Sequence, residues 1–311
     1  MKCEEKMRRI FLIFIMAVCL CSYVSAQSRR MPIYDTPSSS FSMGVGGCRM
    51  GLQNTAYIYT NPVSAYLGED SVWTADYAYA DMGQDLSLHA ITGAYRSGDH
   101  VLMAGVRYFS EGSIDRQIDV DMNIVGGRVN FYSYSTDLGY SHRFGKFSVY
   151  GMLDVASEKT TVRSSAYSVG LGAGYTDSLL AGVYTVAASI RNMGVVSYQN
   201  KNKRLSPLVS AGGSFTFPSW QKQTISIYAD GGVYLSDGAS GASAVFSGGI
   251  DYTLMKRYSL RAGGHLEGHD NYLTAGVGCR VACVTIEAAA KLAKEETAHD
   301  IYMIGVKWQL P

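Results

Sequence analysis

Three residues in the last quarter of the chain have the types and spacing of metal ligands: His265, Glu267 and His269. On a β-strand, residues two apart point to the same face, so these side chains could offer two imidazole nitrogens and a carboxylate to one ion. The neighbouring sequence shows no fourth ligand, and Gly268 indicates that the strand is ending. We therefore predict ordinary polar strand and loop residues here, and we expect no metal and no cofactor.

The number of cysteines argues against a disulfide framework. Beyond residue 26 the chain keeps only Cys48, Cys279 and Cys283, which are too few for a disulfide scaffold. Cys279 and Cys283 flank a three-residue turn and could pair across a hairpin, but two free thiols are the favoured interpretation. Spacing alone identifies no Ser/His/Asp or Cys/His catalytic arrangement.

The composition narrows the class of protein. The 311 residues carry a net charge of +1, which argues against a nucleic-acid-binding surface. Only 17% of them are charged, against about 25% in a typical soluble domain. Disorder is excluded because 47% are hydrophobic. Beyond the N-terminus no apolar run reaches the roughly 20 residues of a spanning helix. The 34 Gly and 23 Tyr residues then favour β structure.

Residues 1–26 have the pattern of a secretory signal peptide. Basic residues open the segment, 10–21 form an apolar core, and small residues precede a predicted cleavage at Ala26/Gln27. Cys19 and Cys21 raise the alternative of a lipoprotein, but a bulky residue precedes each of them. We expect ordinary cleavage and export.

The elements that must position these residues are strands. From residue 71 onward, short segments alternate apolar and polar residues with a period of two. In the last segment, Ile304 and Val306 share one face while Lys307 lies on the other. Residues 287–294 are rich in Ala, but their alternation predicts a strand rather than a helix. The segments begin near residues 71, 86, 99, 129, 146, 162, 179, 207, 223, 243, 258, 271, 282 and 300.

An even number of strands and alternating connection lengths are typical of single-chain bacterial outer-membrane barrels. Short turns alternate with longer connections, of which 110–128 and 191–206 are the longest. A soluble β-sandwich also alternates, but it rarely needs fourteen strands of about ten residues beside so much Tyr. We predict an all-β protein, a 14-stranded antiparallel transmembrane β-barrel formed by residues 71–311, with both termini on the periplasmic side.

Residues 27–70 differ from the rest, because they are rich in Gly, Pro and Ser and show little period-two pattern. The glycines permit tight turns and close backbone approach. We predict that this segment plugs the barrel as an N-terminal hatch.

The hatch segment contains a Gly-Gly pair, Gly46-Gly47, followed about a dozen residues later by Asn61-Pro62. In this it resembles the hatch of FadL-like outer-membrane proteins, and most closely that of the PorV/PorQ family of the type IX secretion system of Bacteroidetes. A second match is Ser189–Gly194, followed by Leu205–Pro207, and a third is Ser259–Gly264. Val63 stands where the family usually has Ala. The hatch motif is carried by Met43, Gly44, Gly46, Gly47, Asn61 and Pro62.

The resemblance implies a non-enzymatic barrel in the bacterial outer membrane, in contact with membrane lipid. It implies a role in type IX secretion, as a shuttle for secreted cargo that carries a C-terminal signal domain or as an anchor for a surface partner. We expect a monomeric barrel that binds no nucleic acid.

Long outer loops are the best candidates for partner contact. The loop at 110–128 contributes a group of apolar residues, and the loop at 191–206 contributes a group of basic residues. The candidate contact residues are Ile114, Ile118, Val120, Ile124, Lys201, Lys203 and Arg204.

Two alternatives of other classes stay open. A FadL-like transporter for hydrophobic small molecules would need an apolar pocket, whereas the predicted inner faces are mostly Ser, Thr, Gly and charged residues. A general porin would need a continuous water path, which a plug opposes.

Overall fold

The computed structural model describes most of the chain beyond the predicted leader. The described residues are 31–52, 57–66, 72–83, 85–115, 119–120, 123–124, 128–160, 162–179, 182–199, 201–218, 222–237, 241–268, 270–294 and 299–310. The predicted signal peptide and its cleavage position lie outside them.

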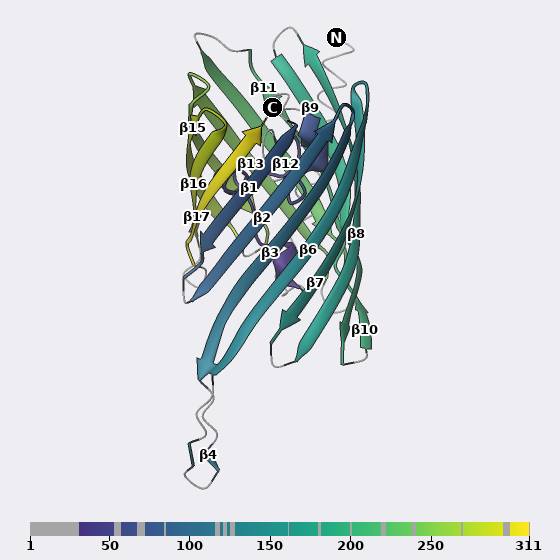
Figure 1. Ribbon diagram of the computed structural model, residues 1–311, viewed down its shortest axis with the longest axis vertical. Helices are drawn as coiled ribbons and strands as arrows, with labels where there is room; N and C mark the ends of the chain where they lie inside the picture. Colours follow the sequence, from purple (N-terminus) through teal and green to yellow (C-terminus); the bar gives the residue numbers. More distant parts are fainter. Residues whose placement is uncertain are drawn as a thin grey trace.

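Fourteen antiparallel strands form a closed barrel, which confirms the predicted fold class (Figure 1). The first strand pairs with both the second and the last, so the sheet has no free edge. The barrel strands are β1 (Trp73–Asp81), β2 (Leu86–Ser97), β3 (His100–Asp115), β6 (Arg128–Phe144), β7 (Phe147–Lys159), β8 (Arg163–Leu179), β9 (Gly182–Tyr198), β11 (Leu208–Thr216), β12 (Gln223–Tyr234), β13 (Ser243–Leu254), β14 (Tyr258–Leu266), β15 (Tyr272–Val281), β16 (Val284–Ala293) and β17 (Ile301–Leu310).

The period-two pattern sorts side chains between two environments. On β3, Leu102 and Val106 point outward and are 57% and 50% exposed, whereas Met103 and Arg107 point inward and are buried. Large apolar side chains cover the outer surface in this way all around the barrel, as expected of a wall that faces lipid. The Ala-rich segment is strand β16, as its alternation predicted. None of the described helices is long and apolar enough to cross a membrane.

The connections also alternate as predicted. β1 begins and β17 ends at one end of the barrel, which we call the turn end, together with the tight turns such as 98–99 and 282–283 (Figure 1). The opposite end, the loop end, carries the longer connections.

The two longest connections are more ordered than predicted. β3 and β6 stay paired as far as Asp115 and Arg128, as a ribbon that protrudes beyond the barrel (Figure 1). Between them along the chain, β4 (Asp119–Val120) and β5 (Asn123–Ile124) pair with each other. β9 runs on to Tyr198, and β10 (Lys201–Arg204) pairs back onto it. The expectation of loops was wrong at these positions, because the antiparallel hydrogen-bond ladder continues past the lipid-facing band and keeps the backbone groups paired.

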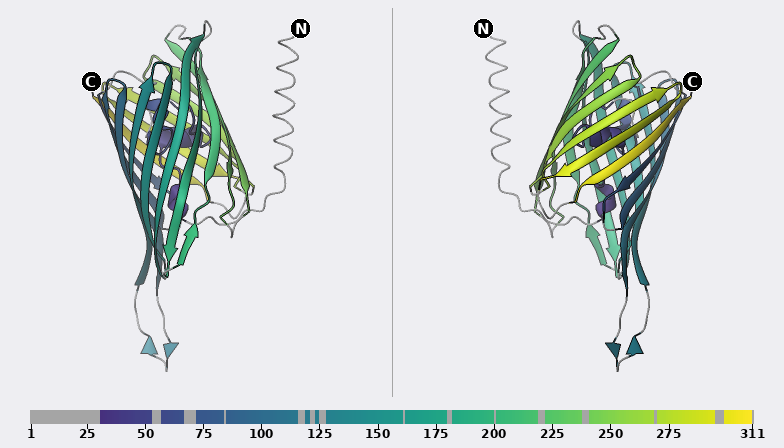
Figure 2. Two further views of the ribbon diagram at one scale, coloured as in Figure 1. Left: turned by 90° about the vertical axis from the view of Figure 1, so that its right-hand side faces the viewer. Right: turned by 90° about the vertical axis from the view of Figure 1, so that its left-hand side faces the viewer.

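Residues 31–52 and 57–66, which we call the hatch segment, lie inside the barrel (Figure 2). They form η1 (Pro32–Tyr34), α2 (Ser40–Gly44) and η2 (Pro62–Tyr66). Their apolar side chains are almost fully buried against the inner wall; Ile58, for instance, packs in one cluster with Met103.

Backbone-to-backbone contact seats the hatch segment on β13 and β14. A Cβ atom added to Gly263 would lie 2.2 Å from the amide nitrogen of Gly46, and one added to Gly249 would lie 2.5 Å from the carbonyl oxygen of Val45. Gly46 itself has a φ of +78°, which side-chain-bearing residues rarely adopt. Glycines on both partners therefore make the close approach possible.

We predict that Gly263→Ala unseats the hatch segment while the barrel still folds. Overpacking of this kind costs about 1–3 kcal/mol, so limited proteolysis in detergent micelles should cleave residues 31–66 about tenfold faster. Gly264→Ala is the matched control, because its Cβ would point outward and meet its nearest atom, in Leu273, at 3.5 Å. Equal cleavage rates in both variants would contradict the proposed seat.

Candidate functional site

Helix α2 is held by charged residues of the inner wall. The Ser40 hydroxyl donates to Oε2 of Glu287 at 3.0 Å, and Oε1 of Glu287 lies 2.7 Å from Arg261. The Arg261 guanidinium lies 3.9 Å from the centre of the Phe41 ring and also pairs with Asp251 at 2.9 Å. A buried arginine between two carboxylates therefore holds the start of α2, directly at Phe41 and through Glu287 at Ser40.

A second arginine holds the later part of the hatch segment. Arg191 is 7% exposed and donates to three successive carbonyl oxygens, those of Ile58, Tyr59 and Thr60, at 2.5, 3.1 and 3.1 Å. The next residue, Asn192, has a φ of +58° beside a β-bulge. The bulge re-aims this part of β9, since extra residues in a strand bend it locally.

A third arginine connects both parts of the hatch segment to β6. Arg107 donates to the carbonyl oxygen of Ile33 at 2.7 Å and pairs with Asp137 at 3.4 Å. The Tyr59 hydroxyl donates to the same carboxylate at 3.0 Å, and its ring lies 4.3 Å from the Arg107 guanidinium.

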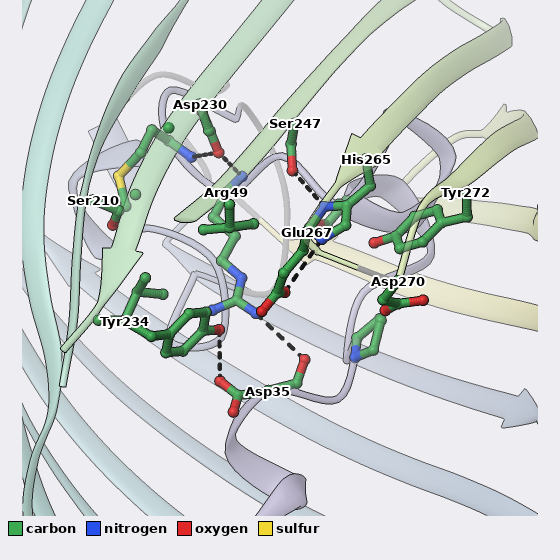
Figure 3. A pocket seen from close by; sticks show the side chains of 18 of the residues that line it. Asp35, Arg49, Ser210, Asp230, Tyr234, Ser247, His265, Glu267, Asp270 and Tyr272 are labelled. Carbon is green, nitrogen blue, oxygen red and sulfur yellow. Dashed lines mark hydrogen bonds and ion pairs between the residues drawn. The ribbon is translucent and has the colours of Figure 1, made fainter. Parts of the chain in front are cut away.

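A cavity of about 140 Å³ lies between the hatch segment and the inner faces of β11 to β16, toward the loop end (Figure 3). The hatch side is fixed by Asp230, whose Oδ2 accepts from the backbone amides of Arg49 and Met50, the latter at 2.9 Å. The Arg49 guanidinium and the Tyr234 hydroxyl both reach Asp35, at 3.4 and 2.8 Å.

The opposite wall of the cavity is aromatic. The His265 and Tyr272 rings stack with centroids 4.5 Å apart, and the Lys291 ammonium lies 4.1 Å from the centre of the Tyr272 ring. Lys291 also pairs with Asp270 at 2.8 Å, and His265 lies 3.5 Å from Glu267. Charge in the lining is thus largely paired. His265 and Lys291 cover the two faces of the Tyr272 ring, so this ring borders the cavity with its edge.

The candidate hatch residues occupy defined places. Gly44, Gly46 and Gly47 lie along the wall of β13 to β15, and Gly47 lines the cavity. Asn61 is fully buried and its side-chain oxygen accepts from the amide of Val63 at 3.2 Å, while Pro62 begins η2.

The candidate partner-contact residues lie at the loop end. Lys201, Lys203 and Arg204 are exposed on β10. Ile114 is the second-last residue of β3, and Val120 and Ile124 belong to β4 and β5. The side chains of these three residues are outside the described set. Ile118 lies outside the described residues altogether.

Two of the three residues that are spaced like metal ligands, His265 and Glu267, are among the described residues. His265 accepts or donates a hydrogen bond with Ser247 at 2.8 Å and, together with Glu267, lines the cavity. His269 lies outside the described residues. Within the described ranges, no three His, Cys, Asp or Glu side chains gather to hold a metal ion. Cys279 and Cys283 are free thiols.

Sequence reasoning missed Asp35, Arg49, Asp230 and Lys291 as parts of one site. They come from the hatch segment and two separate strands, and each alone is an unremarkable polar residue. Of these four residues, only Lys291 gave a signal in the sequence. It lies in a segment that alternates apolar and polar residues, so its charge was expected to be on the inner face.

Thiol labelling tests whether Arg191 holds the hatch segment. Burial, and then the nearby Asp230 carboxylate, raises the pKa of the Cys48 thiol, so its thiolate fraction stays low at about pH 8 and labelling with a maleimide should be slow. In Arg191→Met three carbonyls lose their donor, at a cost of about 1–3 kcal/mol each, and Cys48 labelling should increase severalfold. Exposed Cys283 is the internal standard, in a Cys279→Ser background.

Arg257→Met, which removes an exposed arginine at the turn end, should leave Cys48 labelling unchanged. An unchanged rate in Arg191→Met would contradict the anchoring role.

No protein-family model and no curated protein sequence matches this chain. Solved structures do. The Pseudomonas putida toluene transporter TodX is 9% identical with a TM-score of 0.59, over 86% of this chain and 95% of that one. A deletion mutant of TodX, described as a monoaromatic hydrocarbon channel, is 10% identical with a TM-score of 0.54, over 86% and 96%. The chain therefore has the fold of a FadL-like outer-membrane β-barrel.

Proposed function

We propose that this protein is an outer-membrane transporter for small hydrophobic molecules, gated by its hatch segment. The observation that carries the proposal is the cavity between the hatch segment and the aromatic wall, on a fold similar to that of a toluene transporter. This was the alternative interpretation of the sequence. That interpretation expected an apolar pocket, whereas the lining of this cavity is largely polar, so the proposed ligand must carry a polar group.

The size of the cavity limits the ligand. A cavity of about 150 Å³ holds one benzene molecule, so 140 Å³ suits a single ring rather than a long acyl chain. The His265 ring and the edge of the Tyr272 ring line the cavity, and Asp35, Arg49 and Lys291 place polar groups beside them. The proposed substrate is therefore a one-ring compound with a small polar substituent.

Passage to the turn end requires movement of the hatch segment. Tyr57, Ile58, Tyr59 and Val63 fill the lumen beyond the cavity and pack against β2, β3 and β7. Arg107, Arg191 and Arg261 hold the hatch segment in place, so breaking their contacts contributes to the free energy that this movement requires. A ligand that binds the displaced state better would shift the population toward it.

Filling the cavity tests the proposal. We predict that Val245→Trp, which adds an indole to a cavity-lining position, abolishes uptake of phenol-sized compounds into proteoliposomes. Ala244→Trp is the matched control, because the preceding residue on β13 points to the outer face and should leave uptake unchanged. Uptake that persists in Val245→Trp would overturn the cavity as the binding site.

A second candidate function is that of a type IX secretion accessory protein of the PorV/PorQ kind, as a cargo shuttle or surface anchor. The observation that favours it is the ribbon of β3 and β6, which extends beyond the barrel and offers a projecting surface for a protein partner (Figure 1). The basic residues of β10 would add a second contact at the same end.

Affinity purification from native outer membrane separates the two candidates. Co-purification of secreted proteins that share a C-terminal domain, lost when residues 114–128 are replaced by a short turn, is the result expected of the accessory protein. A barrel recovered alone, whose uptake is unaffected by this deletion, would exclude that function and leave the transporter.

A further inference from the structure

A row of aromatic side chains crosses the outer face of the barrel near the loop end. The His89 ring lies 5.1 Å from that of Tyr79 and 6.5 Å from that of Tyr108, and Tyr108 stacks with Tyr132 at 6.1 Å. The row thus passes from β1 through β2 and β3 to β6. Aromatic rows of this kind lie at the boundary between the hydrocarbon and the headgroups.

The row ends at two cations that face each other. Lys159 on β7 is the register partner of Tyr132 on one side and of Arg163 on the other. The Lys159 ammonium lies 5.6 Å from the centre of the Tyr132 ring. Both basic side chains are exposed. Like charges directly opposite each other on adjacent strands destabilise a sheet unless an anion lies between them.

The described part of the chain supplies no such anion. The adjacent carboxylate, Glu158, points to the other face of β7 and accepts a hydrogen bond from Ser164 at 3.2 Å. No described acidic side chain pairs with Lys159 or Arg163. The pair therefore presents two positive charges outward, beside an aromatic ring.

The position of the pair indicates what neutralises it. Val155 and Tyr167, on the same outer faces, are 45% and 57% exposed and belong to the lipid-facing band. Lys159 and Arg163 each lie four residues further toward the loop end, about 13 Å along the strand. They thus lie just beyond the exposed apolar band and beside the aromatic row, where headgroups are expected.

We propose that Lys159, Arg163 and Tyr132 form a binding site for the phosphate of an anionic membrane lipid. The planar guanidinium suits two phosphate oxygens at once, and the ammonium adds a point charge. Acyl chains of the same lipid would lie against Val155 and Tyr167 below. The commitment to a membrane lipid, rather than a soluble phosphate, follows from this continuity of headgroup and acyl contacts.

Native mass spectrometry of the whole barrel in a neutral detergent tests the site. The probes are bisphosphorylated lipid A, the same lipid after enzymatic dephosphorylation, and inorganic phosphate. We expect the wild type to bind the phosphorylated lipid at least tenfold more tightly than the dephosphorylated one. Lys159→Gln/Arg163→Gln should remove this difference.

Lys256→Gln/Arg257→Gln is the matched control, since it removes the same charge from exposed residues at the turn end. Resistance of the folded barrel to unheated SDS establishes that each variant folds. A preference that survives in Lys159→Gln/Arg163→Gln, or is lost equally in the control, would overturn the site. Displacement of the lipid by millimolar inorganic phosphate would overturn the assignment to a lipid.

Discussion

The hatch segment can occupy the barrel only because backbone meets backbone along β13 and β14. At Gly249 and Gly263 the wall offers no side chain, and at Gly46 the hatch segment offers none either. These short backbone contacts add to the apolar clusters that the hatch segment forms with the inner wall. The position of the cavity depends on this seat, because Gly47 and Arg49 follow it directly in the chain.

Polar residues of the lumen complete the attachment. Arg107, Arg191 and Arg261 each connect the hatch segment to a different part of the wall, through carbonyl oxygens or carboxylates. A buried charge is tolerated only where it is paired, so these arginines specify one position of the hatch segment more than they add net stability. The inner faces are therefore polar for a structural reason, whether or not they contact a ligand.

Much of the fold could be predicted from the sequence, whereas the cavity could not. The outer and inner faces of each barrel strand meet different environments, so an alternation of apolar and polar residues such as Val106–Arg107 can be recognised in the sequence itself. The cavity depends on which hatch residue meets which strand. Arg49 and Asp230 are 181 positions apart, and no local pattern encodes their contact. The ribbons of β3, β6 and β9 were missed because pairing beyond the lipid band needs no apolar face.

The closing pair of strands has a consequence for biogenesis. Trp73 pairs with Leu310, so the cylinder cannot close until the last strand is made. The hatch segment is synthesised before the strands. Yet the hydroxyl that accepts a hydrogen bond from the Gly46 amide belongs to Thr274, 228 positions later. Such non-local contacts form slowly. The glycine-rich hatch segment must therefore remain unseated until the later strands are made, and it is enclosed only when the sheet closes.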